Sequence, residues 1–148
     1  MRALNYLSGV VLAAAAVAGC SSSTTFDPMG SGRSNEDSTQ LAAYAASAKY
    51  PSDVQPKTDT KLAAMFNGDN VRIVNFSNEP VRDANVWVNN TFVHKIAIVP
   101  PLGTVTVNKS TFYDPTGRNL SSANVTPTTV TVQTGNTVWS TLGPVVER

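Results

Sequence analysis

Two short runs of β-branched residues near the end of the chain predict a β-hairpin. They cover residues 128–134 and 137–142, and Gly135-Asn136 stands between them. Glycine followed by asparagine suits the central positions of a type II′ turn, whose twist matches that of paired strands. The resulting register places the valines of the first run and Trp139 on one face, and mostly hydroxyl side chains on the other. One face is therefore expected to be buried and the other solvated.

A second hairpin is predicted around Asn89-Asn90, because asparagine tolerates positive φ and two in succession suit a type I′ turn. Residues 84–88 and 91–99 would form its strands. A two-residue turn places Trp87 directly opposite Phe92, on the same face. Both faces of this hairpin are apolar, so we expect it either to be covered on both sides or to use one face for binding.

The remaining patterns complete a domain that consists mainly of strands. Residues 71–76 are typical of an interior strand, residues 104–107 predict another, and residues 61–66 predict one helical turn. About six short strands, with turn signals roughly every 8–12 residues, are typical of a sandwich. The sequence therefore predicts a mainly β fold, a small antiparallel β-sandwich over residues 61–148.

The chain before the sandwich is expected to be a tether that contains one short helix. Residues 21–38 hold few large apolar side chains, which is typical of a disordered segment. The next residues are rich in alanine, and Leu41 and Tyr44 share one helical face. We therefore expect a helix near 39–50, within a tether that spans residues 20–60. The pattern leaves open whether this helix lies on the sandwich, frays in solvent or docks a partner.

The N-terminus has the organisation of an export signal. Arg2 precedes an apolar run at residues 10–16, and small residues follow immediately before Cys20, the only cysteine in the chain. The small and apolar residues form a run of about ten, whereas a membrane-spanning helix needs roughly 20. We therefore expect a signal peptide and not a span. A plain secretory cleavage site remains an alternative.

The sequence Val17-Ala18-Gly19-Cys20 resembles the lipobox of bacterial lipoprotein signal peptides. The resemblance implies that residues 1–19 are removed and that Cys20 is acylated, with palmitate among its chains. Several acyl chains anchor a protein stably, whereas one chain holds it only marginally. Ser21 follows the cysteine, where many inner-membrane lipoproteins have aspartate. The resemblance therefore favours the outer membrane, facing the periplasm, if the source has two membranes.

A second resemblance concerns the domain itself. The strand at 71–76 breaks just after Asn75, and Phe112-Tyr113-Asp114 is followed by Gly117, three positions after the aspartate. This order resembles small immunoglobulin-like modules of bacterial envelope proteins. The resemblance supports the sandwich fold and implies no particular ligand.

Composition excludes several classes of function. The formal net charge is +1, which provides no strong field to recruit nucleic acid. With Cys20 acylated, no cysteine remains for a disulfide or a metal site. The single histidine, His94, lies between apolar neighbours, and no G-x-S-x-G motif marks a nucleophile. We therefore expect neither an enzyme nor a bound metal or cofactor.

Binding is the function class that remains. Trp87, Phe92, Asn89 and Asn90 form the predicted binding surface, on the second hairpin. Our first hypothesis is a membrane-anchored, non-catalytic lipoprotein of the cell envelope that acts as a protein-interaction or structural module. Its partners would be an envelope protein and, through acylated Cys20, membrane lipid.

Two other functions remain as alternatives. A cell-wall or glycan binder requires Trp87 or Trp139 to be exposed beside an asparagine of the second hairpin, because sugars stack on aromatic rings. A small hydrolase is the second alternative, and it requires His94 to lie in a cleft beside a hydroxyl and a carboxylate.

Overall fold

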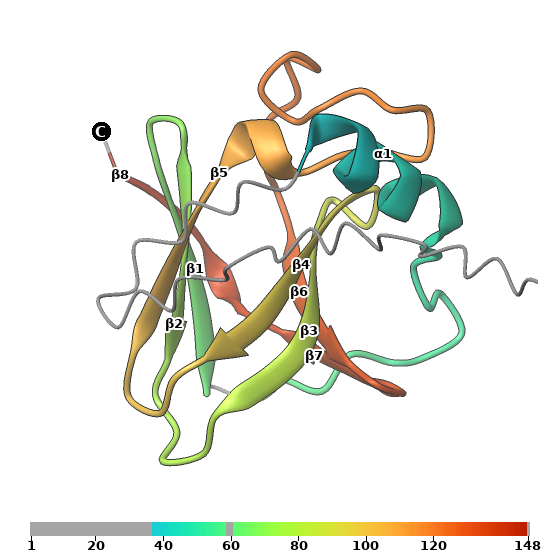
Figure 1. Ribbon diagram of the computed structural model, residues 1–148. Coiled ribbons are helices and arrows are strands. Elements are labelled where there is room, and N and C mark those ends of the chain that lie inside the picture. The colour runs from blue at the N-terminus through green and yellow to red at the C-terminus, as the bar shows by residue number, and fades with distance from the viewer. Residues whose placement is uncertain (1–36, 59–60, 148) are drawn as a thin grey trace, which may run out of the picture.

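Strands account for most of the regular structure in residues 37–58 and 61–147, the part of the chain that the computed structural model describes. They form two four-stranded sheets, which pack face to face around one apolar core (Figure 1). The first sheet has the order β5-β2-β1-β8. Its strands are β1 (Leu62–Asn67), β2 (Asn70–Asn75), β5 (Thr104–Asn108) and β8 (Leu142–Glu147).

The second sheet has the order β4-β3-β6-β7. Its strands are β3 (Val81–Val88), β4 (Phe92–Val99), β6 (Val130–Thr134) and β7 (Thr137–Ser140). Two short helices complete the fold, α1 (Ser38–Ser47) and a 3-10 turn (Lys109–Thr111). The mainly β fold and the small sandwich expected from the sequence are therefore confirmed. Strand pairing is antiparallel except between β1 and β8, which run parallel.

β1 replaces the helical turn that was expected at residues 61–66, so that prediction was wrong. Leu62, Ala64 and Phe66 are buried at every second position, as the period of a strand requires. β1 lies between β2 and β8, which take up its backbone N–H and C=O groups on both sides. Gly68, at φ 53°, makes the tight turn into β2. Tertiary pairing thus outweighs the helix propensity of the two alanines and Met65.

The β3–β4 hairpin has the expected turn but a different register. Asn89 and Asn90 both have positive φ, and the Thr91 N–H donates to the Val88 carbonyl at 3.1 Å, as in a two-residue turn. Thr91 does not pair with any residue of β3, because Val88 pairs with Phe92 and Trp87 pairs with Val93. Trp87 and Phe92 therefore lie on opposite faces, and the predicted register was wrong by one residue.

The observed register is the one that fills both faces of this hairpin with well-packed side chains. A slip of one residue turns every side chain of a strand to the other face. Here it directs Phe92 and Ile96 into the core between the sheets and places Val93 beside Trp87 on the outer face. The expectation that this hairpin is covered on both sides is met.

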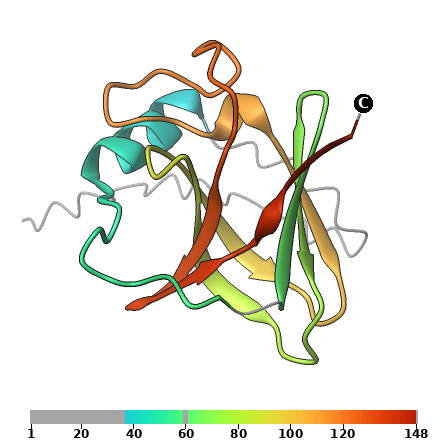
Figure 2. The same ribbon diagram turned by 180° about the vertical axis from the view of Figure 1, so that it is seen from behind.

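The last hairpin is confirmed at its turn. Thr134 pairs with Thr137 across Gly135-Asn136, and Gly135 has φ 54°, as the first central residue of a type II′ turn requires. The expected strand at 137–142 is not continuous, however. The chain leaves the second sheet after Ser140 and enters the first sheet as β8 (Figure 2).

The outer face of the second sheet is covered by α1 and by the segment that follows it. Leu41 and Ala45 of α1 are buried against Trp87, Val93 and Tyr113. Consequently, the hydroxyl face of the last hairpin is only partly solvated: Thr131 is buried there, whereas Gln133 and Ser140 are half-buried.

The helix predicted near 39–50 is thus present as α1, ends three residues earlier, and lies on the sandwich. Cys20 and residues 20–36 of the expected tether lie outside the described residues.

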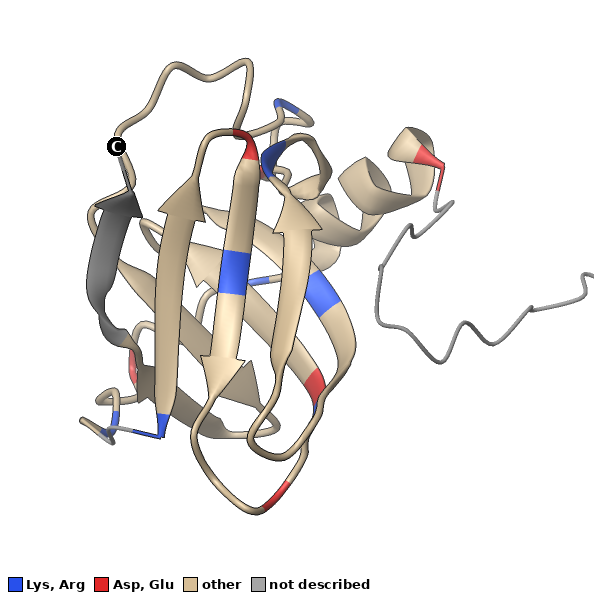
Figure 3. Ribbon diagram, turned by 90° about the vertical axis from the view of Figure 1, so that its left-hand side faces the viewer, with Lys and Arg blue, Asp and Glu red and all other residues tan. Residues whose placement is uncertain are grey.

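Charged side chains are sparse on the first sheet. Figure 3 views this sheet from its outer side and shows few charged residues along its strands. Arg72 is the one charged residue in β1, β2 and β5, and it lies in the middle of β2. Lys61 and Glu79 lie instead beyond the ends of the strands, where the two sheets separate.

Candidate functional site

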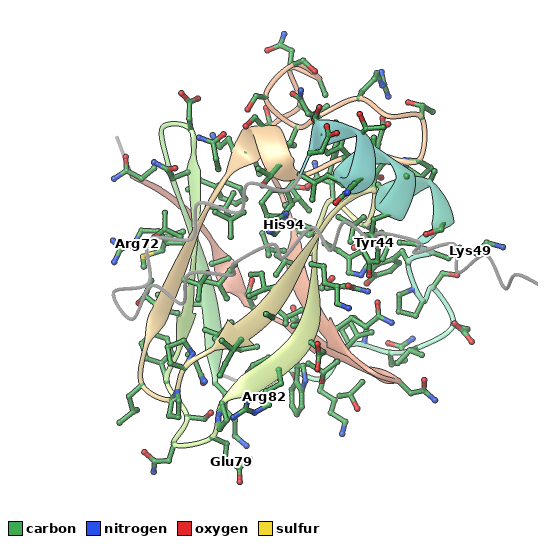
Figure 4. The ribbon with its side chains drawn as sticks, in the orientation of Figure 1. Tyr44, Lys49, Arg72, Glu79, Arg82 and His94 are labelled. Carbon is green, nitrogen blue, oxygen red and sulfur yellow. The ribbon has the colours of Figure 1, made fainter. Side chains whose placement is uncertain are left out.

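A groove opens at one end of the sandwich, where the two sheets separate. Its volume is about 340 Å³, which lies near the lower limit for small-ligand pockets. We call it the end groove, and it is lined by Lys61, Leu62, Asn75, Ser77, Glu79, Pro80, Val81, Arg82, Thr134 and Trp139. Figure 4 shows Glu79 and Arg82 at this end of the molecule, remote from α1 and its Tyr44.

The apolar part of the end-groove lining includes Leu62, Val81 and Trp139. Leu62 is buried, whereas Val81 and Trp139 are half-buried and pack against the core. The Trp139 indole N–H donates to the Thr134 hydroxyl at 3.5 Å, which is at the limit of a hydrogen bond. The Lys57 ammonium lies 5.3 Å from the centre of the indole ring, within the range of a cation–π interaction. The groove therefore offers apolar surface and a weakly engaged donor.

Asn75 makes one wall of the end groove rigid. Its Nδ2 donates to the backbone carbonyl of Glu79 at 2.7 Å and to that of Pro100 at 3.1 Å. Its Oδ1 accepts from the backbone N–H of Ser77 at 2.9 Å and from the Ser77 hydroxyl at 2.7 Å. One buried side chain thus ties the β2–β3 connection to the β4–β5 connection. A ligand would meet a wall that is already ordered, which lowers the entropic cost of binding.

Three large apolar side chains are exposed on segments that adjoin the end groove. Phe76 is 54% exposed, Leu102 is 70% exposed and Ile98 is 40% exposed. The Leu102 N–H donates to the carbonyl of Ser77, a groove residue, at 2.9 Å, and Ile98 pairs directly with Arg82. We call Phe76, Ile98 and Leu102 the end patch.

The rim of the end groove is positively charged on balance. Lys61 and Arg82 contribute two cations against the one carboxylate of Glu79. Among the described residues, the Arg82 guanidinium has no hydrogen-bond or ion-pair partner, and no ion pair joins it to Glu79. An exposed guanidinium at the edge of an apolar groove is available for an anionic group of a ligand.

Two of the four residues predicted to form a binding surface are buried. Trp87 is 2% exposed and Phe92 is 3% exposed. The Trp87 indole N–H donates to Gln133 Oε1 at 3.0 Å, and Tyr50 packs edge-on against its ring at 5.5 Å. Phe92 lies in the core between the sheets. The predicted surface was therefore wrong for both, because α1 covers one side of the hairpin and the first sheet covers the other.

The other two residues of the predicted surface, Asn89 and Asn90, lie at the far end of the hairpin from the end groove. Asn90 is exposed, whereas the Asn89 side chain holds a neighbouring segment. Asn89 Oδ1 accepts from the Thr128 N–H at 2.8 Å, and Nδ2 donates to the Thr126 carbonyl at 2.9 Å. Through these bonds, Asn89 positions the start of β6.

Trp139 and His94 do not meet the conditions set for the alternative functions. The asparagine that lines the groove with Trp139 is Asn75, whose amide is already hydrogen-bonded on both sides. His94 is buried, its Nδ1 lies 3.2 Å from the Thr111 carbonyl, and its ring packs against Phe112 at 5.3 Å. His94 is a packed, buried side chain, and Trp139 lines the end groove.

The sequence did not predict the end groove, because its residues come from three segments that are distant along the chain. The usable signal was Trp139, the one tryptophan that remains half-buried. Phe76 was assigned to the preceding strand, although β2 ends at Asn75 and leaves the ring in solvent.

Comparisons with known proteins add no assignment to this site. No protein-family model matches the chain, and neither curated proteins nor solved structures gave a match. Within residues 37–58 and 61–147, no helix is long and apolar enough to cross a bilayer. In the same part of the chain, no three His, Cys, Asp or Glu side chains converge as metal ligands would.

Proposed function

We propose that the protein is a lipid-anchored component of the bacterial cell envelope that binds another envelope protein through the open end of its sandwich and catalyses no reaction. The end patch is the observation that carries this proposal. Three large apolar side chains stay in solvent there, beside a preformed groove, at an energetic cost that a bound partner would remove.

The position of the end patch supports an anchored binding module. The described chain begins at Asp37, just before α1, and the β2–β3 and β4–β5 connections, which carry Phe76 and Leu102, lie at the opposite end of the sandwich (Figure 1). If acylated Cys20 holds the protein at a membrane, the tether enters the domain at the α1 end. The end patch is then free to meet a partner in the aqueous compartment.

Photo-crosslinking in cells tests this proposal directly. Benzoylphenylalanine in place of Phe76 keeps an aromatic ring at the centre of the end patch. The matched control carries the same probe at Val125, which is 40% exposed and lies at the other end of the sandwich. We expect a discrete protein adduct from position 76 and none from position 125, and we expect Leu102→Ser to weaken the adduct. Equal labelling from both positions, no adduct from position 76, or adducts to wall glycan would contradict the proposal.

A further inference from the structure

We propose that the end groove binds an apolar residue that carries a free carboxylate, as the last residue of a polypeptide does. This inference rests on the proposed function, because it names the part of a partner that the open end would recognise. The apolar side chain would enter the groove, and Arg82 on the rim would bind the carboxylate.

The size and the lining of the groove favour a single residue. A cavity of about 150 Å³ holds a benzene molecule, so about 340 Å³ holds a large aliphatic side chain together with its carboxylate. Leu62, Val81 and Trp139 supply apolar contacts on the inside. The Trp139 indole N–H makes only a 3.5 Å bond to Thr134, so it remains a donor for a ligand oxygen.

The charges on the rim favour one carboxylate and disfavour two. Arg82 makes no side-chain hydrogen bond or ion pair with any residue that the structure describes, and guanidinium binds carboxylate in a two-pronged geometry. Lys61 and Lys57 add positive charge nearby, the latter above the Trp139 ring. Glu79 lies on the same rim and would repel a second anionic group. A chain terminus, which joins one apolar side chain to one carboxylate, fits this arrangement.

The test is a titration of the mature, lipidated protein in nanodiscs, labelled with 5-fluorotryptophan. The two tryptophans give two ¹⁹F signals, which Trp139→Phe assigns. The probe is N-acetyl-leucine, and its matched control is N-acetyl-leucinamide, which has the same side chain and no charge. We expect N-acetyl-leucine to shift the Trp139 signal saturably, with a Kd of about 1 mM for so small a ligand. The buried Trp87 signal should stay in place and serves as the internal control for folding.

Arg82→Gln separates recognition of the carboxylate from apolar contact. We expect this variant to bind N-acetyl-leucine about threefold to fivefold more weakly, as for an exposed ion pair, and to bind the amide as the parent protein does. Equal binding of the acid and the amide by the parent protein would overturn the inference. A loss of both ligands in Arg82→Gln, or a shift of Trp87 alone, would also overturn it.

The titration tests this inference and the crosslinking tests the proposed function, so either one can fail while the other succeeds. Selective binding of N-acetyl-leucine without any adduct at position 76 would refute the proposed function and leave the groove as a carboxylate site. An adduct at position 76 without selective binding would keep the proposed function and refute this inference.

Discussion

The indole N–H of Trp87 donates to the amide oxygen of Gln133 at 3.0 Å, beneath the ring of Tyr50. The largest side chain on the outer face of the second sheet is therefore both buried and hydrogen-bonded. This bond joins β3 to β6, and the segment after α1 closes over it. Trp87, which the sequence predicts to be part of a binding surface, is instead a buried side chain against which α1 packs.

Tyr44→Phe should loosen α1. The Tyr44 hydroxyl donates to Asn85 Oδ1 at 2.6 Å, and α1 buries only Leu41 and Ala45 besides. A helix of 10 residues is marginal without such contacts. We expect a loss of about 1 kcal/mol in urea denaturation and faster hydrogen exchange in α1. The exposed Lys49→Ala is the control, and equal effects of the two variants would show that the bond does not hold the helix.

Thr131→Val should stabilise the protein, which few core substitutions do. Thr131 Oγ1 is buried and has no hydrogen-bond partner among the described residues. Valine removes that unsatisfied hydroxyl at nearly the same volume, so we expect a gain of up to about 1 kcal/mol. Thr141→Val is the matched control, because the buried Thr141 hydroxyl donates to the Val130 carbonyl at 2.9 Å. That variant should lose about 1 kcal/mol, and an identical sign for both would contradict the account.

Protonation of Asp114 should make the protein less stable in acid. Burial of the carboxyl alone would raise its pKa, but hydrogen bonds from Thr116 and Arg118 outweigh burial and hold the pKa below the ordinary aspartate value. A carboxyl whose pKa is lowered by folding contributes stability above its unfolded pKa. This contribution is lost as the pH falls through the folded pKa. We therefore expect the free energy of unfolding to drop below about pH 4.

Asp114→Asn isolates this acid dependence. The Arg118 side chain is 67% exposed, so its ion pair is screened. The hydrogen bond from the Thr116 hydroxyl lowers the pKa most, and the backbone N–H groups of Arg118 and Thr116 add to the effect. At pH 7 the variant should lose about 1–3 kcal/mol, and its acid limb should be flatter than that of the parent protein. Parallel pH profiles of parent and variant, measured by thermal unfolding, would show that other carboxylates dominate.

Asn75→Ala should damage the end groove and the fold together. The substitution leaves the carbonyls of Glu79 and Pro100 and the N–H of Ser77 without their present partner. We expect a loss of about 2–3 kcal/mol and weaker binding of N-acetyl-leucine. Asn78→Ala, on the exposed surface of the same connection, is the control and should change stability by less than about 0.5 kcal/mol. Comparable unfolding midpoints for the two variants would contradict the role given to Asn75.

Cys20→Ala tests the anchor. If Cys20 is the acylated residue, its loss should stall processing of the signal peptide or release the protein from the membrane fraction. Fractionation followed by immunoblotting measures both effects. Unchanged processing together with normal membrane retention would remove the lipobox interpretation. Ser21→Ala leaves the cysteine in place and is the control.

Local chemistry made several elements of the fold predictable. Gly135-Asn136 specifies its own turn, and the register of β6 and β7 follows from that turn alone. β2 and β5 were predicted because alternating β-branched residues favour a strand wherever it pairs. The sandwich fold followed from the number and spacing of such runs.

Other features of the fold came from contacts between distant segments. β1 is a strand because β2 and β8 pair with it, although Ala63, Ala64 and Met65 favour a helix. The β3–β4 register shifts by one because packing between the sheets and beneath α1 outweighs the local preference of a two-residue turn.

By itself the sequence determined most of the strand content and one turn, since each depends on neighbouring residues. The tertiary structure alone decided that Trp87 is buried, that Phe76 is exposed, and that Arg82 and Trp139 border one groove. Burial and proximity depend on which surfaces meet after folding. Periodicity within one strand says only that a face is apolar, and not which other element will cover it.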